Sequence, residues 1–244
     1  MATVSILMPA YRAAPTIGAA IASIQAQTEP DWELLVINDR SQDETVQTAL
    51  EFAQEDDRIR ILDNDGPKGA AAARNAGLAH ATGRYIAFLD ADDEWLPNKL
   101  ASQLALLLET NAPLCYTGFE VKRAKRHIRD VRVPTSVTYE QLLAGNIIGC
   151  LTAMYDTQIC GKVTMPLIKR RHDFALWLHI LKAHGPACGI PEPHAILRLA
   201  NGTLSSNKIL ATYGTWRMYR DIVGLSIPKS MVSLYRHLRQ RILR

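Results

Sequence analysis

The feature that most constrains the fold is a regular alternation of short apolar runs and helical patterns over the first 120 residues. Each apolar run is six or seven residues long and is followed by a segment whose apolar residues recur at helical spacing. The runs occupy residues 4–9, 33–39, 58–63 and 85–90. This alternation predicts an α/β fold with a mostly parallel central sheet and helices on both faces. Strands covered on both faces should be apolar throughout, and these runs are.

The second half of the chain is less regular. Its strand candidates are residues 114–121, 150–156 and 195–200, and "HDFALWLHILKAHG" predicts an amphipathic helix over 172–185. With 244 residues, 48% of them hydrophobic, the chain can form one large core with an appendage. We expect a main domain over 1–206, divided into halves 1–120 and 121–206, and a basic helical segment over 207–244.

Two further features concern the compartment of the protein. No stretch approaches 18 uninterrupted apolar residues, so no membrane-spanning helix is expected, and "MATVSILMPAYR" is interpreted as a first strand and not as a signal peptide. The cysteines are scattered without a C-x-x-C pair, which favours free thiols in a reducing cytoplasm over disulfides or zinc. They are Cys115, Cys150, Cys160 and Cys188.

An acidic cluster follows the strand candidate at 85–90. In "YIAFLDADDEWLP" the carboxylates are Asp90, Asp92, Asp93 and Glu94. Like charges this close are best tolerated when a cation shares the site, and carboxylates without Cys or His suit Mg²⁺ or Mn²⁺. Asp39 ends another strand at the same edge, where ligands of parallel sheets bind. The alternative is a polar turn that caps the helix beginning near Pro97.

Two basic residues flank the helix that follows the third strand. In "GPKGAAAARNAG", Lys68 and Arg74 could approach a phosphate or a base, although Arg74 could equally be a solvated helix charge. Neither a Walker motif nor G-x-G-x-x-G after a strand is present. P-loop and Rossmann dinucleotide chemistry are therefore disfavoured, and a diphosphate would be held by a metal and not by a glycine cradle.

Taken together, "VSILMPAYRAAPTIGAAIASIQAQTEPDWELLVINDRSQDET" and "GAAAARNAGLAHATGRYIAFLDADDEWLPNKL" resemble the nucleotide-sugar half of family 2 glycosyltransferases. The resemblance covers about the first 120 residues, with several motifs in order. It implies the GT-A fold, an inverting reaction and a divalent metal, Mn²⁺ or Mg²⁺.

The resemblance also implies roles for individual residues. Asp39 should accept a hydrogen bond from the base, Asp90 should contact the ribose, and Asp92 should ligate the metal. The residues of the nucleotide-sugar site would be Pro9, Tyr11, Asp39, Lys68, Arg74, Asp90 and Ala91. Asn38 and Arg12 depart from the family pattern, which often has aspartate and asparagine there, and these two departures bear on the donor preference.

The acceptor side of the resemblance lies in "RRHDFALWL". The family places its general base as an aspartate that opens a helix, and here this residue is Asp173. His172 stands where a glutamate is usual, which could alter the base or the choice of acceptor. Asp173 alone could instead be an acid favoured by the helix dipole. Trp177 could stack on a sugar on the acceptor side or belong to the core.

The resemblance therefore implies a non-processive transferase, since neither Q-x-x-R-W nor membrane helices are visible. Its donor would be a nucleotide-sugar, usually a UDP-sugar, and its acceptor a glycan or lipid-linked sugar in bacterial surface polysaccharide synthesis. An inactive nucleotide-sugar-binding scaffold is the alternative, supported by His172. A nucleotidyltransferase would need a glycine-rich basic loop, which "MPAYRAAPT" does not supply.

The C-terminal segment is strongly basic. Residues 207–244 contain eight basic residues and one acidic residue, so this segment carries +7 and the rest of the chain −3. The segment also interleaves aromatic and aliphatic residues with arginine. Such helices can lie on an anionic membrane surface, here the inner face of the cell membrane. They can equally pack on the body or on a second subunit of a homodimer. No recognised nucleic-acid-binding module is present.

Overall fold

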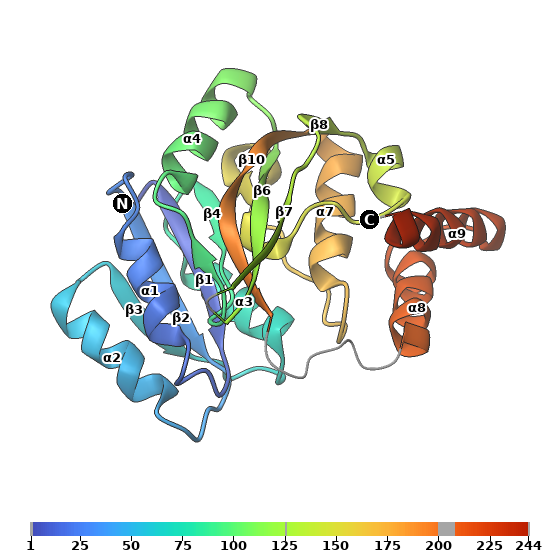
Figure 1. Ribbon diagram of the computed structural model, residues 1–244. Coiled ribbons are helices and arrows are strands. Elements are labelled where there is room, and N and C mark those ends of the chain that lie inside the picture. The colour runs from blue at the N-terminus through green and yellow to red at the C-terminus, as the bar shows by residue number, and fades with distance from the viewer. Residues whose placement is uncertain (1, 125, 200–207, 244) are drawn as a thin grey trace.

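The computed structural model describes residues 2–124, 126–199 and 208–243 (Figure 1). Within these residues the chain forms a ten-stranded sheet with the order β3-β2-β1-β4-β9-β6-β10-β5; β7 pairs with β6, and β8 with β10. The predicted end of the last strand at residue 200 and the predicted domain boundary at 206–207 lie outside the described residues.

The first half has the predicted β-α alternation. The strands are β1 (Val4–Ala10), β2 (Trp32–Asn38), β3 (Ile59–Asp63) and β4 (Tyr85–Phe88), and the helices are α1 (Ile17–Gln25), α2 (Thr45–Glu55), α3 (Ala70–His80) and α4 (Lys99–Thr110). These four strands pair in parallel, β3 with β2, β2 with β1 and β1 with β4. Their carboxyl ends therefore meet at one edge of the sheet.

The second half adds antiparallel pairs and short elements. They are β5 (Glu94–Trp95), β6 (Leu114–Arg123), β7 (Arg126–Val131), β8 (Ser136–Val137), β9 (Met154–Asp156), β10 (Ala187–Leu199), α5 (Tyr139–Leu143), α6 (Thr157–Cys160) and α7 (His172–His184). The predicted strand at 150–156 is shorter, because Cys150–Thr152 form a 3-10 turn. The basic stretch after residue 122 forms the β6–β7 hairpin, which the sequence analysis did not predict.

Strand β10 begins eight residues before the predicted start at 195. The sequence "GIPEP" contains two prolines, which ordinarily interrupt a strand. The structure accommodates them with register shifts against β6 between Ile190 and Ala195. Gly118 of β6 makes room for this irregularity, because a Cβ there would lie 2.5 Å from the carbonyl oxygen of Pro191. The prolines thus bend the strand without ending it.

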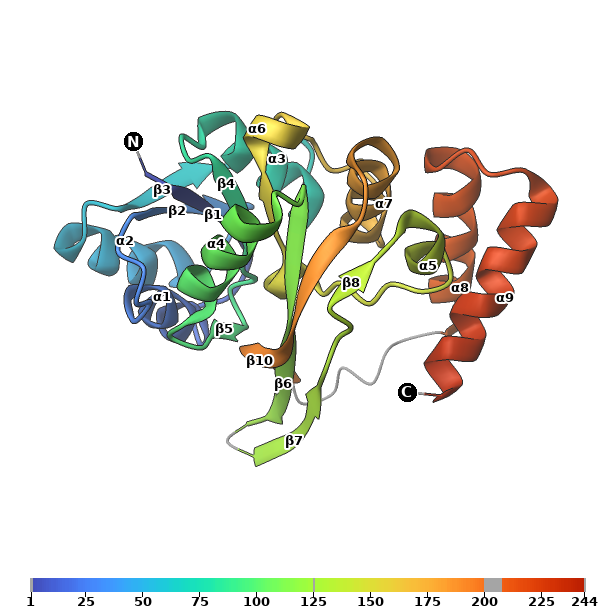
Figure 2. The same cartoon turned by 90° about the horizontal axis from the view of Figure 1, so that it is seen from above.

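The sheet has a hydrophobic core on each face. Helices α1, α2 and α4 pack on one face, and α3 and α7 pack on the other (Figures 1 and 2). Both faces of β1, β2 and β4 are covered, which explains their largely apolar sequences. β3, at the edge of the sheet, is less buried and carries Arg60 and Asp63. Trp177 of α7 is fully buried and packs edge-on against Phe88, with ring centroids 5.6 Å apart. Its predicted alternative role, stacking on a sugar, is therefore wrong for this structure.

The C-terminal segment is helical over α8 (Lys208–Arg217), a π-helical turn (Met218–Ile222) and α9 (Ile227–Leu243). Helices α8 and α9 lie side by side beyond α7 (Figure 2). Met218 and Tyr219 are buried in the core of the body, and the Tyr219 hydroxyl donates to the Leu143 carbonyl oxygen of α5 at 2.7 Å. The segment is thus fixed to the body. No helix in the described ranges could cross a bilayer.

Candidate active site

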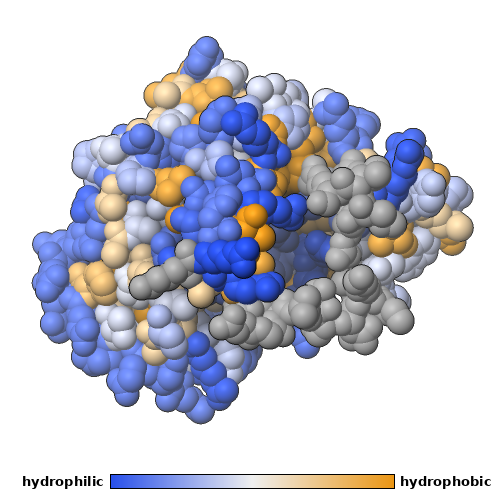
Figure 3. All heavy atoms as spheres, viewed as in Figure 1, coloured by the Kyte–Doolittle hydropathy of each residue, from blue (hydrophilic) through white to orange (hydrophobic). Residues whose placement is uncertain are grey.

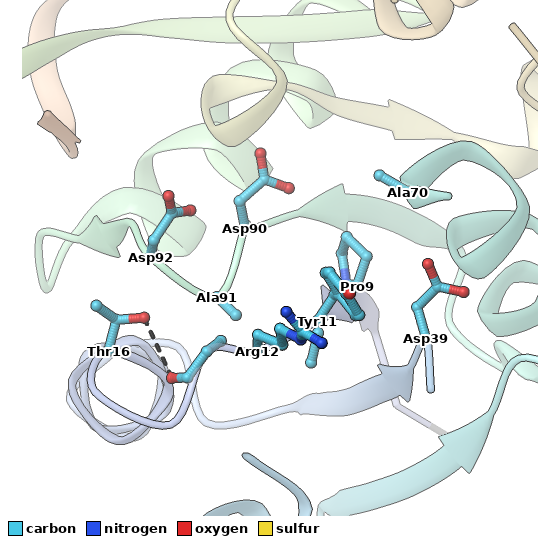
Figure 4. A pocket seen from close by; sticks show the side chains of 11 residues that line it. Pro9, Tyr11, Arg12, Thr16, Asp39, Ala70, Asp90, Ala91 and Asp92 are labelled. Atoms are coloured by element: carbon cyan, nitrogen blue, oxygen red, sulfur yellow. Dashed lines mark hydrogen bonds between the residues drawn. The ribbon is translucent and has the colours of Figure 1, made fainter. Parts of the chain in front are cut away.

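A cavity of about 270 Å³ opens where β1, β2 and β4 end (Figure 4). Its lining combines three carboxylates with residues from the end of β1 and from the loop that follows it. The lining residues are Pro9, Ala10, Tyr11, Arg12, Ala13, Thr16, Asp39, Ala70, Asp90, Ala91 and Asp92. Six of the predicted donor-site and metal residues therefore meet at one place, because parallel strands bring their carboxyl ends together.

Asp39, directly after β2, forms one wall of the cavity and is 4% exposed. One carboxylate oxygen accepts a hydrogen bond from the Asn64 side-chain amide at 2.7 Å, and the other accepts one from the Gly69 backbone N–H at 2.8 Å. These two bonds fix the carboxylate and join it to the loop that leads into α3. Sequence reasoning missed Asn64, although its place directly after the third strand puts it at the same edge.

Cations lie beside Tyr11 at the mouth of the cavity. The Lys68 ammonium is 3.8 Å from the centre of the Tyr11 ring, and the Arg12 guanidinium carbon is 5.3 Å from it. Tyr11 is 43% exposed, so part of its ring is open to solvent at the mouth of the cavity. Lys68, which does not line the cavity itself, is thereby held at its rim. This arrangement suits a base stacked beside a phosphate.

The four carboxylates of the acidic cluster divide into two pairs. Asp90 and Asp92 line the cavity (Figure 4). Asp93 is 4% exposed and accepts a hydrogen bond from the Arg198 backbone N–H at 2.8 Å, and Glu94 pairs with the Arg198 side chain. Only the first pair is therefore available to a ligand, while the second anchors β10.

Burial raises the pKa of Asp93 to about 8, with the charge of Asp90 adding to the effect. Desolvation and the charge of Asp90 also raise the pKa of Asp92. These shifts show that negative charge is concentrated at this strand end. A bound cation would lower that electrostatic cost.

The raised pKa of Asp93 predicts a pH-dependent stability. Between its ordinary pKa of 3.8 and the folded value of about 8, the folded chain binds a proton that the unfolded chain releases. The free energy of unfolding should therefore fall as pH rises through this window. Asp93→Asn should abolish this fall in the free energy of unfolding. The variant should therefore be more stable than the unaltered protein at pH 9 by about 1 kcal/mol or more, with a smaller difference at acidic pH. Thermal unfolding in EDTA across pH would measure this; equal gains at all pH values would contradict it.

The oxygen atoms of the acidic cluster can be compared with the ligands that a metal ion requires. Among the described residues, no group of three or more His, Cys, Asp or Glu side chains is arranged to hold a metal. Asp92, with Asp90 beside it, offers only hard oxygen ligands. Mg²⁺ and Mn²⁺ are commonly bound by one or two carboxylates, with water and substrate phosphates completing the shell. The residues therefore fit a divalent ion that arrives with a diphosphate.

Arg74 of α3 joins the acidic cluster to α7. It is 2% exposed, forms an ion pair with Asp90, and its Nη1 lies 2.8 Å from Nε2 of His172. Burial alone would lower the pKa of Arg74, but Asp90, Cys150 and Asp173 together raise it above its ordinary value. Arg74 is therefore a buried, charged bridge, and its interpretation as a solvated helix charge is wrong.

His172 and Asp173 begin helix α7, directly after Arg171 in a left-handed conformation with φ of 67°. Burial and the neighbouring Arg74 charge lower the pKa of His172. Because arginine can only donate, Nε2 of His172 accepts this hydrogen bond and the ring is neutral. Asp173 lies close enough for its charge to act on both Arg74 and His172. The structure thus brings the predicted acceptor-side pair next to the donor pocket.

Comparison with known proteins identifies the architecture. Residues 5–153 match the family model described as "Glycosyl transferase family 2". The chain belongs to this glycosyltransferase family. It is 38% identical over 229 residues to the "Putative teichuronic acid biosynthesis glycosyltransferase TuaG" of Bacillus subtilis, covering 93% of this chain and 91% of the relative. It is 40% identical over 235 residues to the "UDP-Glc:alpha-D-GlcNAc-diphosphoundecaprenol beta-1,3-glucosyltransferase WfgD" of Escherichia coli, covering 95% and 89%.

Solved structures support the same fold for this family 2 glycosyltransferase. TarS 1-349 of S. aureus in complex with UDP-GlcNAc has a TM-score of 0.77 at 16% identity, covering 100% of this chain and 73% of TarS. The mannosyltransferase PcManGT from Pyrobaculum calidifontis, in complex with GDP-Man and Mn²⁺, has a TM-score of 0.74 at 18% identity, covering 96% and 68%. The predicted GT-A fold is confirmed.

Proposed function

We propose that this glycosyltransferase moves a sugar from a UDP-sugar to a hydroxyl group of a lipid-linked acceptor during synthesis of a bacterial surface polysaccharide. The observation that carries the proposal is the bridge of Arg74 between Asp90, at the donor pocket, and His172, next to Asp173. One buried cation thus couples the place where a diphosphate would leave to the place where a hydroxyl would attack.

The donor pocket supports a nucleoside diphosphate sugar. The fixed carboxylate of Asp39 can accept a hydrogen bond from an imide N–H, which uracil has. The Escherichia coli relative is named for UDP-Glc, and TarS was solved with UDP-GlcNAc. PcManGT shares the fold but holds GDP-Man, so the fold alone does not select uridine. The proposed preference for uridine therefore depends on Asp39 and on the donors named for the relatives.

The acceptor follows from the relatives and the position of Asp173. WfgD is named for an undecaprenol-diphosphate-linked sugar and TuaG for teichuronic acid biosynthesis. In our proposal Asp173 removes the proton from the acceptor hydroxyl as this attacks the anomeric carbon, and one displacement inverts the configuration. Arg74 stabilises Asp90 and keeps a positive charge beside the departing diphosphate. When bound at Asp92, a divalent ion would supply further neutralisation of the leaving group.

Nucleotide binding tests the proposed donor. UDP with Mn²⁺ should raise the melting temperature, whereas GDP should not. Asp39→Asn should weaken UDP binding about tenfold or more, since a charge-assisted hydrogen bond is lost. Asp63→Asn is a matched control, because Asp63 ends the neighbouring strand β3 but bonds Asn38 outside the cavity. A stronger shift with GDP, or equal losses in both variants, would contradict the uridine site.

A transfer assay then separates an enzyme from a scaffold. The unaltered chain should release UDP from a UDP-sugar in the presence of a lipid-linked or synthetic acceptor. UDP binding without any turnover of several donors would favour the scaffold alternative.

A further inference from the structure

Helix α9 carries a row of large apolar side chains that face solvent. Ile227, Met231 and Tyr235 are 56%, 60% and 68% exposed. Their spacing of four residues places them on one side of the helix, which we call the outer stripe. The inward side is formed by Ser230, Ser233 and His237, which are all buried. Figure 3 shows hydrophobic groups among hydrophilic ones in the region of α8 and α9.

Exposed cations occupy the rest of the solvent-facing arc of α9. Arg239 lies one turn after Tyr235, at the edge of the outer stripe, whereas Lys229 and Arg236 lie further round the helix. Lys182 of α7 joins Lys229 and Arg236 around a neighbouring cavity of about 650 Å³, in which Glu140 is the acidic residue. Within the described part of 208–243, the acidic side chain is Asp221, and it bonds Arg217 at 2.7 Å. The solvent-facing arc of α9 therefore has an apolar row along one edge and positive charge toward the other.

The position of α9 relative to the proposed base is fixed by packing. The His237 ring stacks on Phe174 with centroids 6.0 Å apart, and Phe174 directly follows Asp173. The same Phe174 packs against Tyr219, also at 6.0 Å. An α-helix is about 10 Å wide. Tyr235, on the side of α9 away from His237, thus lies roughly one helix diameter from the residue next to Asp173.

We propose that the outer stripe and its flanking cations dock α9 on an anionic membrane surface. An amphipathic helix with aromatic and aliphatic groups beside Lys and Arg has the pattern of a helix that lies in the lipid interface. A second copy fits less well, because a two-fold contact would place the same cations of both copies together. Anionic headgroups instead neutralise them. The purpose of docking, access to a lipid-linked acceptor, rests on the proposed function; the binding itself does not.

The full chain should co-sediment with vesicles of phosphatidylcholine and phosphatidylglycerol, and much less with phosphatidylcholine alone. The double variant Met231→Ser/Tyr235→Ser should bind at least about tenfold more weakly. Leu108→Ser is the matched control, since Leu108 on α4 is 68% exposed like Tyr235 but lies on another helix. Lys229→Gln, Arg236→Gln and Arg239→Gln should each weaken binding to the anionic vesicles about fivefold.

Two further measurements keep the outcome clear. The thermal shift with UDP should be unchanged in all these variants, so that a failure of the donor site is distinguished from a failure of docking. Equal vesicle binding by the double variant and Leu108→Ser would overturn the proposal, as would absence of binding by the unaltered chain. A dimer in light scattering that the double variant dissociates would assign the stripe to a second copy and also overturn it.

Discussion

Asp173→Asn should lower the turnover number for sugar transfer by about 100- to 10,000-fold, the range expected when a general base is removed. Asparagine has nearly the same size and keeps the hydrogen-bonding ability of the first turn of α7, but it cannot take up the acceptor proton. UDP affinity should be unchanged, because Asp173 is not among the residues that line the donor cavity. Initial rates of UDP release with acceptor present, together with UDP titration, measure the two quantities separately.

Glu140→Gln provides the control for a purely electrostatic effect on the helix. Glu140 occupies the first turn of α5 as Asp173 occupies the first turn of α7. Both substitutions should therefore cost a similar stabilisation by the helix dipole, about 0.3–1 kcal/mol. Only Asp173→Asn should stop transfer. If both variants transfer normally and melt slightly earlier, Asp173 is a helix N-terminal acid and the base lies elsewhere.

The first half of the fold and its pocket could be predicted because the governing signals are local. Uniform apolar runs identify parallel strands, and the carboxyl ends of parallel strands necessarily meet. Asp39 and Asp90 come within two residues of such an end and Asp92 follows four residues after one, so their convergence around one cavity follows from the sequence pattern. Asn64 obeys the same rule and was missed only because an amide carries less obvious chemistry than a carboxylate.

The remaining features depend on contacts between distant segments. Asp93 and Glu94 look like ligands in the sequence, yet Arg198, more than 100 residues away, binds both. Likewise the environment of His172 is set by Arg74, 98 residues earlier. Strand β10 continues through two prolines only because Gly118 on its neighbour leaves space. A local sequence pattern cannot predict these contacts, because the residues that make them are far apart in the sequence and meet only in the complete fold.

For the basic C-terminal segment, the sequence left several alternatives open, and the structure decides part of them. Its sequence allowed packing on the body, docking on a membrane or association with a second subunit. Met218 and Tyr219 are buried in the body, so packing is confirmed for the π-helical turn. The outer stripe of α9 consists of other residues, Ile227, Met231 and Tyr235, and stays exposed. Packing and docking therefore involve different residues and are compatible.

Asp92→Asn should remove the metal dependence of donor binding. The unaltered chain should show a larger UDP-induced thermal shift with Mn²⁺ than with EDTA, and the variant should show the smaller shift under both conditions. Its turnover should fall about 1,000-fold, because several kcal/mol of leaving-group stabilisation would be lost. Titrations of Mn²⁺ at fixed UDP, followed by thermal shift and by UDP release, measure both effects.

The neighbouring Asp93 supplies the control for this experiment. Asp93→Asn removes a carboxylate from the same strand end, but that carboxylate points to the Arg198 backbone and does not line the cavity. It should therefore retain the Mn²⁺-dependent shift and most of the turnover. The reverse pattern, loss in Asp93→Asn and retention in Asp92→Asn, would place the metal on the β10 side of the cluster. Metal dependence in both variants equal to that of the unaltered chain would show that neither Asp92 nor Asp93 is needed to hold the metal. Absence of metal dependence in the unaltered chain would instead leave Arg74 and Lys68 as the cations that neutralise the diphosphate.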